Sequence, residues 1–148
     1  MNLRNLTASL ICALAVVLGL QAQDAKEPQT ELGAKMEKIG AAFRKANRQI
    51  ADKTQNADTL AQLAIVRENM TAALKLEPKM TADKPAADKA KFVADYQATM
   101  KKELAKVEAI EAALKAGNNE EAAKIAGDLN ASYKDAHKMF KKATPKKN

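Results

Sequence analysis

Cysteine and histidine are almost absent from this chain of 148 residues, which contains one of each. A single cysteine cannot build a disulfide framework or a cysteine-based zinc or iron–sulfur centre. A single histidine cannot supply the two imidazoles of an HExxH zinc site or of a catalytic dyad that needs two histidines. Few catalytic chemistries remain after these exclusions.

Residues typical of β-structure and of tight turns are also scarce. The chain has no tryptophan, 3% aromatic residues, five glycines and four prolines, which argues against a sandwich, a barrel or a collagen-like fold. Apolar residues still make up 47% of the chain, mostly Ala, Leu, Met and Ile, and the charged 29% is chiefly Lys and Glu. Because these residues favour helices, the composition predicts a single all-α domain with one buried core.

The N-terminus has the features of a secretory signal peptide, which we assign to residues 1–22. Arg4 supplies a positive charge, Leu10 to Leu20 form an apolar segment, and Ala22 offers a small residue for cleavage. The apolar segment is short for a membrane span, which needs about 20 residues. An uncleaved membrane anchor stays open as the alternative.

The mature chain, 23–148, is basic and is expected in the periplasm. It retains 24 basic and 18 acidic residues, a net charge of +6, because Arg4 is the only charge removed. An exported protein does not meet genomic DNA, so we expect no nucleic-acid partner. Cleavage removes the apolar segment, so we expect no membrane association of the mature chain. We interpret the charge as a solvated surface or as a docking field for an acidic partner.

Apolar residues recur at alternating spacings of three and four along the mature chain, which predicts helices that each bury one face. The predicted helices span about 31–53, 57–76, 87–116 and 119–142. Thr30 is a suitable N-cap for the first of them. The seams of the first, third and last helices are Leu32, Met36, Ile39, Phe43, Ala46 and Ile50; Val93, Tyr96, Met100, Val107, Ile110 and Leu114; and Ala122, Ala126, Leu129, Tyr133, Ala136 and Phe140.

The segments between the predicted helices contain residues that end or begin helices. Pro78 and Pro85 lie in the longest loop. Gly117 ends the third helix, and Asn118 with Glu121 resembles a capping box that begins the last. Four helices joined mostly by short turns predict an antiparallel up-down-up-down four-helix bundle. An extended coiled coil or hairpin dimer would need longer uninterrupted seams.

In such a bundle the first helix begins and the last helix ends at the same end. Met36 and His137 each lie about one turn from that end, so a rise of 1.5 Å per residue places both within roughly 8–10 Å of it. The third helix brings Tyr96 and Met100 to the same level, and the second brings Met70. The sequence therefore predicts an apolar crevice with one imidazole at its side.

A thioether and an imidazole that face each other across an apolar slot are the axial ligands of a low-spin haem with a relatively high reduction potential. Each residue also has an ordinary alternative role. Met36 occupies a seam position, where methionine commonly fills the core. His137 lies at the edge of a seam, where a lone histidine is commonly a partly exposed, hydrogen-bonded side chain. Taken singly, these residues do not support haem binding.

Three segments of the mature chain resemble the cytochrome b562 family of soluble periplasmic four-helix haem proteins. Residues 32–39, LGAKMEKI, are similar to its opening helix, in which a methionine between two apolar residues is an axial ligand. Residues 129–140, LNASYKDAHKMF, are similar to its closing helix around the histidine ligand. Residues 112–123, AALKAGNNEEAA, are similar to its turn into that helix. The resemblance covers nearly all of residues 31–142.

The resemblance implies one non-covalently bound b-type haem with Met36 and His137 as the metal ligands. Tyr96 and Met100 take the places of residues that pack against the haem. The predicted cofactor-binding residues are Met36, His137, Tyr96, Met100, Phe140 and Ile39. The chain lacks the Cys-x-x-Cys-His motif by which the related cytochromes c′ attach haem, which excludes covalent attachment.

Three positions depart from the family pattern. Ala136 stands where an aromatic residue is expected before the histidine, Tyr133 where a basic residue is expected, and Met100 where a phenylalanine is expected. These changes alter the packing and exposure of the haem edge but spare both ligands.

The implied function is electron transfer by a soluble periplasmic protein that is not an enzyme, because two axial ligands leave iron no open position for a substrate. We expect a monomer with a redox partner protein, an acidic one if the lysines of the C-terminal segment steer docking. Those lysines are Lys134, Lys138, Lys141, Lys142, Lys146 and Lys147. Two alternatives stay open: a haem-free periplasmic helical binding or chaperone-like module, and a copper-binding protein, since methionine suits Cu(I).

Overall fold

The computed structural model describes residues 30–140. The predicted signal peptide, 1–22, and the lysines that follow Phe140 lie outside the described residues. Over 30–140 the chain forms four α-helices, two short 3-10 helices and no strand, which agrees with a four-helix bundle. The α-helices are α1, Glu31–Gln49; α2, Asn56–Ala73; α3, Ala86–Lys115; and α4, Asn119–Phe140.

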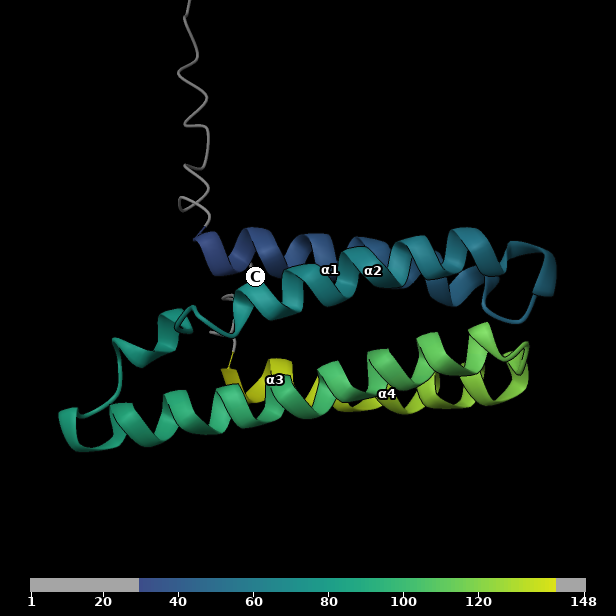
Figure 1. The fold of residues 1–148 in the computed structure, drawn as a ribbon. Helices are drawn as coiled ribbons and strands as arrows, with labels where there is room; N and C mark the ends of the chain where they lie inside the picture. The colour runs from purple at the N-terminus through teal and green to yellow at the C-terminus, as the bar shows by residue number, and fades with distance from the viewer. Residues whose placement is uncertain (1–29, 141–148) are drawn as a thin grey trace, which may run out of the picture.

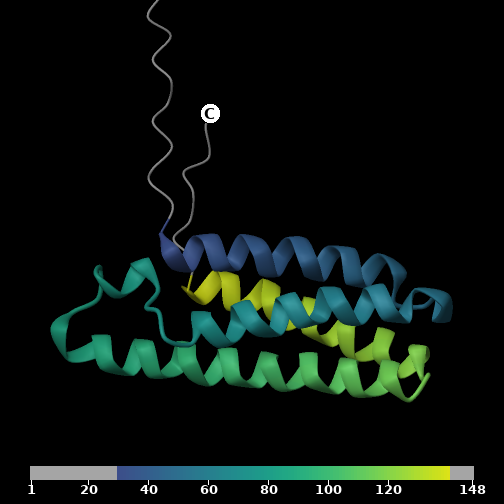
Figure 2. The same ribbon diagram turned by 45° about the horizontal axis from the view of Figure 1, so that its top comes forward.

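The chain reverses direction at each of its connections, as Figure 1 shows. Helices α1 and α2 form one hairpin, α3 and α4 form a second, and the two hairpins lie face to face (Figures 1 and 2). The connections after α1 and after α3 lie at one end of the molecule. The longer connection between α2 and α3 lies at the other end, where α1 begins and α4 ends.

Polar side chains decide where α1 begins and ends. The Thr30 hydroxyl accepts a hydrogen bond from the Gly33 amide at 3.0 Å, so Thr30 is the N-cap. Helix α1 ends at Gln49 rather than near residue 53, because the Asp52 carboxylate accepts a hydrogen bond from the Thr54 amide at 2.9 Å and begins a separate 3-10 helix. A short polar side chain thus replaces the last predicted turn.

The connection between α2 and α3 is the longest, and it contains both prolines that the sequence places there. Helix α2 ends at Ala73, somewhat before the predicted residue 76. Pro78 then begins the 3-10 helix Lys79–Thr81, and Pro85 directly precedes α3. Proline suits both places, since each is the start of a helical turn, where a missing amide proton is not needed.

A residue with a left-handed backbone conformation joins α3 to α4. Gly117 has a φ of 72°, which favours glycine. The Asn118 side chain accepts a hydrogen bond from the Glu121 amide at 3.2 Å. The Asn118 backbone amide donates to the Ala113 carbonyl at 2.9 Å. The side chain of Asn118 therefore caps the start of α4, and its backbone amide satisfies a carbonyl near the end of α3.

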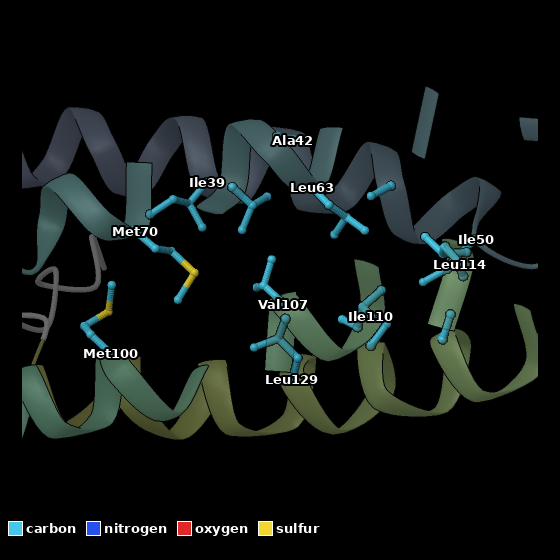
Figure 3. Packing of buried hydrophobic residues seen from close by; sticks show 14 of the residues in the cluster. Ile39, Ala42, Ile50, Leu63, Met70, Met100, Val107, Ile110, Leu114 and Leu129 are labelled. Carbon is cyan, nitrogen blue, oxygen red and sulfur yellow. The ribbon is translucent and has the colours of Figure 1, made fainter. Parts of the chain in front are cut away.

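The core runs between the two hairpins along the length of the molecule, as Figure 3 shows for residues from Ile39 and Met70 at one end to Ile50 and Leu114 at the other. All four helices contribute buried apolar side chains. The fully buried large side chains include Leu63, Val66, Val107 and Ile110. The predicted seams therefore meet one another inside the molecule.

Two buried amides close the end of the molecule that holds the short connections. The Asn119 side chain donates hydrogen bonds to the Ile50 carbonyl and to Asn56 Oδ1, both at 2.7 Å. The Asn56 side chain donates to the Leu114 carbonyl at 3.3 Å. These bonds link the end of α1, the start of α2 and the turn between α3 and α4.

Candidate functional site

An apolar slot opens at the end of the molecule where α1 begins and α4 ends, and all four helices line it. The six residues that the sequence proposes for cofactor binding all line this slot: Met36, Ile39, Tyr96, Met100, His137 and Phe140. The tertiary structure therefore brings them together from the two ends of the mature chain and from its middle.

The slot is narrow and is open on one side. Its cavity volume is about 60 Å³. Nearly all of the wall is apolar, so the slot holds water poorly.

Methionines from three helices line the slot. They are Met36 from α1, Met70 from α2 and Met100 from α3. Met36 is partly exposed, whereas Met70 and Met100 are buried. Figure 3 shows Met70 and Met100 pointing into the space between the two hairpins.

The imidazole of His137 lies against an aromatic neighbour on its own helix. The ring centroids of Tyr133 and His137 are 4.3 Å apart, with the ring planes tilted by 43°. Both side chains are partly buried, and both line the slot. Tyr133 stands one turn before His137, so this contact limits the orientations that the imidazole can adopt.

Tyr133 also approaches α1 at a glycine. A Cβ atom at Gly40 would lie 3.9 Å from the Tyr133 hydroxyl and 3.2 Å from Arg44 Nη1. Burial raises the pKa of Tyr133, and the nearby Arg44 guanidinium opposes that shift. A side chain at Gly40 would therefore crowd the end of Arg44 but would touch Tyr133 only at ordinary contact distance.

Tyr96 is fixed in the floor of the slot by a hydrogen bond. Its hydroxyl donates to the Ala73 carbonyl at the end of α2, at 3.0 Å. Burial raises the pKa of Tyr96 to about 12, so the phenol stays neutral at physiological pH. Phe140 packs edge-on against the Tyr96 ring at 5.5 Å and at a tilt against the Phe92 ring at 5.4 Å. These aromatic contacts join the end of α4 to the first half of α3 beside the slot.

A carboxylate also lines the slot, and the seam of α3 gives the signal that could have found it. Tyr96, Met100 and Val107 follow the alternating spacing, which places the intervening seam position at residue 103. Glu103 occupies it and is buried. Glutamate is polar and does not look like a core residue, although the spacing alone points to this position. Gly40 and Tyr133 lie one turn from Met36 and His137, and the same helical spacing could have assigned them to the slot.

Two further properties concern metal ions and membranes. Within residues 30–140, no three His, Cys, Asp or Glu side chains gather as they would around a metal ion. None of the helices described between these residues is both long enough and apolar enough to span a bilayer.

Residues 31–141, about three quarters of the chain, match the family model described as cytochrome b562. This range contains all four helices and every residue that lines the slot. The searches of curated proteins and of solved structures gave no match.

Proposed function

The chain belongs to the cytochrome b562 family, whose members are haem-binding electron carriers, and on that premise we propose that its slot holds one non-covalently bound b-type haem. The protein then acts as a soluble periplasmic carrier of single electrons. Met36 and His137 are the proposed axial ligands. Tyr96, Met100, Ile39 and Phe140 are the proposed packing residues.

One observation carries this proposal: Met36 from the first helix and His137 from the last line the same apolar slot. Their donor atoms, a thioether sulfur and an imidazole nitrogen, suit low-spin haem iron. The surrounding rings and aliphatic side chains suit a flat apolar macrocycle. The proposal includes an antiparallel up-down-up-down order of the helices, because this order brings the two proposed ligands to the same end of the bundle. The reversals of the chain in Figure 1 support this order.

Haem, when bound, supplies an iron centre that accepts and releases one electron. The protein's own residues do the rest. Met36 and His137 would hold the iron and would leave it no position for a substrate, so we propose that the protein is not an enzyme. The apolar walls exclude water and favour the less charged reduced state, which raises the potential together with the thioether ligand.

We further propose that the partner is an acidic redox protein that docks at the open end of the slot. Lys134 and Lys138 lie on the last turns of α4, near the slot, and both are exposed. Lys138 is paired with Asp135 at 2.9 Å, with both side chains mostly exposed, so that pair contributes little to stability. The remaining lysines of the predicted basic rim follow residue 140, outside the described residues.

The proposed function is tested by visible spectroscopy of the purified mature protein with one equivalent of haem. We expect sharp α and β bands on reduction and extraction of the chromophore into acidified organic solvent, as for haem b. A free-haem spectrum, or a chromophore that stays with the protein, would contradict the proposal. The first result would favour the haem-free binding module.

A Cu(I) site is the second candidate, because one observation favours it. Met36, Met70 and Met100 line the same slot as His137, and thioethers with an imidazole suit Cu(I). The two candidates are separated by competition. If the slot binds haem, adding Cu(I) to the haem-loaded protein leaves the spectrum unchanged. A copper site predicts that Cu(I) binds the haem-free protein tightly and that haem does not displace it.

A further inference from the structure

The apolar seam of α3 is interrupted by one carboxylate. Glu103 stands at a seam position between Met100 and Val107, where the helix faces the interior. It is only 6% exposed and it lines the slot. Burial of a carboxylate among apolar side chains is unfavourable unless the charge is paired. The neighbours of Glu103 therefore decide what it does there.

Glu103 is paired with one side chain from α4 and one from its own helix. The Ser132 hydroxyl donates a hydrogen bond to Glu103 Oε2 at 2.7 Å. The Lys106 ammonium lies 3.3 Å from the same oxygen and donates to the Ser132 hydroxyl at 2.7 Å. Both partners are donors to the carboxylate, so its charge is paired.

The two charges of this pair are not equally exposed. The Glu103 side chain is 8% exposed, whereas the Lys106 side chain is 33% exposed. Lys106 does not line the slot, and water screens its charge more strongly than that of the carboxylate. The carboxylate, which lines the slot, is therefore the less screened of the two charges there.

We propose that Glu103 is a potential-setting residue: its buried charge stabilises the oxidised form of the haem assigned to this slot and lowers the reduction potential. This inference rests on the proposed function. Reduction adds one electron to the iron centre, with no bond formed or broken and no proton required. A neighbouring negative charge opposes that step by simple electrostatic repulsion.

General electrostatics gives the size of the effect. A unit charge about 10 Å away, in surroundings with an effective dielectric constant of about 20, changes a one-electron equilibrium by roughly ten- to twentyfold. The positive charge of Lys106 offsets part of the effect of the Glu103 charge on this equilibrium. We therefore expect Glu103 to alter the ratio of oxidised to reduced protein by about three- to tenfold, where tenfold corresponds to about 59 mV for one electron.

Glu111 provides a matched control on the same helix. It is also buried, 8% exposed, and it is also paired with cations: Arg67 at 3.2 Å and Lys115 at 3.9 Å. Unlike Glu103, it does not line the slot. The two glutamates therefore differ in their position relative to the slot more than in their burial or pairing.

The test compares the reduction potentials of the haem-loaded wild type, Glu103→Gln and Glu111→Gln. Glutamine keeps the size of the side chain and an oxygen that can accept from Ser132. We expect Glu103→Gln to have a more positive potential by the amount given above, and Glu111→Gln to stay close to the wild type. If Glu103→Gln does not load haem, Glu103→Leu, which restores an apolar seam, is measured in its place with the same expected direction.

The outcomes separate this inference from the proposed function. Intact haem spectra with a Glu103→Gln potential that equals the Glu111→Gln potential, or lies below that of the wild type, would overturn the role of Glu103 alone. A wild-type protein with no reduced-haem spectrum would overturn the proposed function and this inference with it.

Discussion

At the level of single residues, the two proposed ligands differ in whether a neighbouring side chain at the slot could take over when one is removed. His137 is the only histidine in the chain. Met36 is one of three methionines that line the slot, with Met70 and Met100. Loss of the imidazole therefore leaves no substitute, whereas loss of the Met36 thioether leaves two sulfurs in the same space.

We expect His137→Ala to abolish the low-spin haem spectrum, because no other imidazole is present. The measurement is the reduced visible spectrum after haem is added. Lys138→Ala, on the next and exposed position of α4, is the control and should keep the wild-type spectrum. A normal spectrum for His137→Ala would show that His137 is not a ligand.

Met36→Ala should have a smaller effect than His137→Ala. We expect haem to bind, with one open axial position that takes water or carbon monoxide, and a lower potential because the thioether is lost. Met139→Ala, a methionine of α4 that is 56% exposed, serves as the control. If Met36→Ala keeps both spectrum and potential, Met70 or Met100 is the axial ligand instead.

Tyr96 gives a prediction on the dependence of stability on pH. The pKa of its phenol rises from 10 to about 12 on folding, so the stability it contributes is complete below pH 10 and is lost as pH rises toward 12. Tyr96→Phe removes the hydrogen bond to Ala73 and should cost about 1 kcal/mol below pH 10.

This deficit should shrink between pH 10 and 12 in urea-unfolding experiments on the haem-free protein, because only the wild type loses stability when Tyr96 ionises. Titration of the lysines affects both proteins equally and cancels in the comparison. A deficit that stays constant from pH 8 to 12 would contradict the raised pKa.

At the scale of helices, most ends are set by one or two polar residues or by a glycine. Thr30 caps α1, and Asp52 begins the 3-10 helix that follows it. Gly117 ends α3 with a positive φ. Gly127, in contrast, lies within α4 and is exposed, with nothing within 4 Å of a Cβ added to it. Glycine therefore favours the folded state at position 117, in the turn, and disfavours it at position 127, within the helix.

We expect Gly117→Ala to destabilise the protein by about 1 kcal/mol, because alanine is strained at a φ of 72°. Gly127→Ala should stabilise it by about 0.5–1 kcal/mol, because alanine favours the helix more than glycine does. The measurement is chemical unfolding of both variants without haem. Shifts of the same sign in the two variants would contradict this account of the turn.

At the scale of the whole molecule, the two ends of the bundle have different roles. The end with the short connections is closed by the amides of Asn56 and Asn119. The other end holds the slot and the longest connection. Stability and ligand binding can therefore be altered separately, although haem that binds only the folded protein stabilises it as a whole.

We expect Asn119→Ala to cost about 2–3 kcal/mol, because it leaves the Ile50 carbonyl and Asn56 Oδ1 without the donor that bonds to them. The haem spectrum should stay unchanged, and haem should raise the melting temperature of the variant as much as that of the wild type. Asn118→Ala, which removes only an exposed cap, should cost about 1 kcal/mol. An altered spectrum in Asn119→Ala would show that the two ends are coupled.

Local sequence was enough to predict the four helices and several of the residues that cap them, although α1 and α2 end a few residues before their predicted ends. The spacing of the apolar residues predicted four helices, and Thr30 and Gly117 occupy the capping positions expected of them. These features depend on interactions within a few residues, so they can be read from local sequence. The resemblance to the cytochrome b562 family also rested on local segments, and the family match confirms it.

The packing of helices against one another set which polar groups are buried, and it added residues to those expected at the slot. Glu103 is buried, with its carboxylate accepting a hydrogen bond from Ser132 on another helix. Gly40 and Tyr133 line the slot beside the residues that the sequence predicted there. Each of these facts depends on how helices pack against one another, and the periodicity of a single helix states which face is buried but not which residues of other helices it meets.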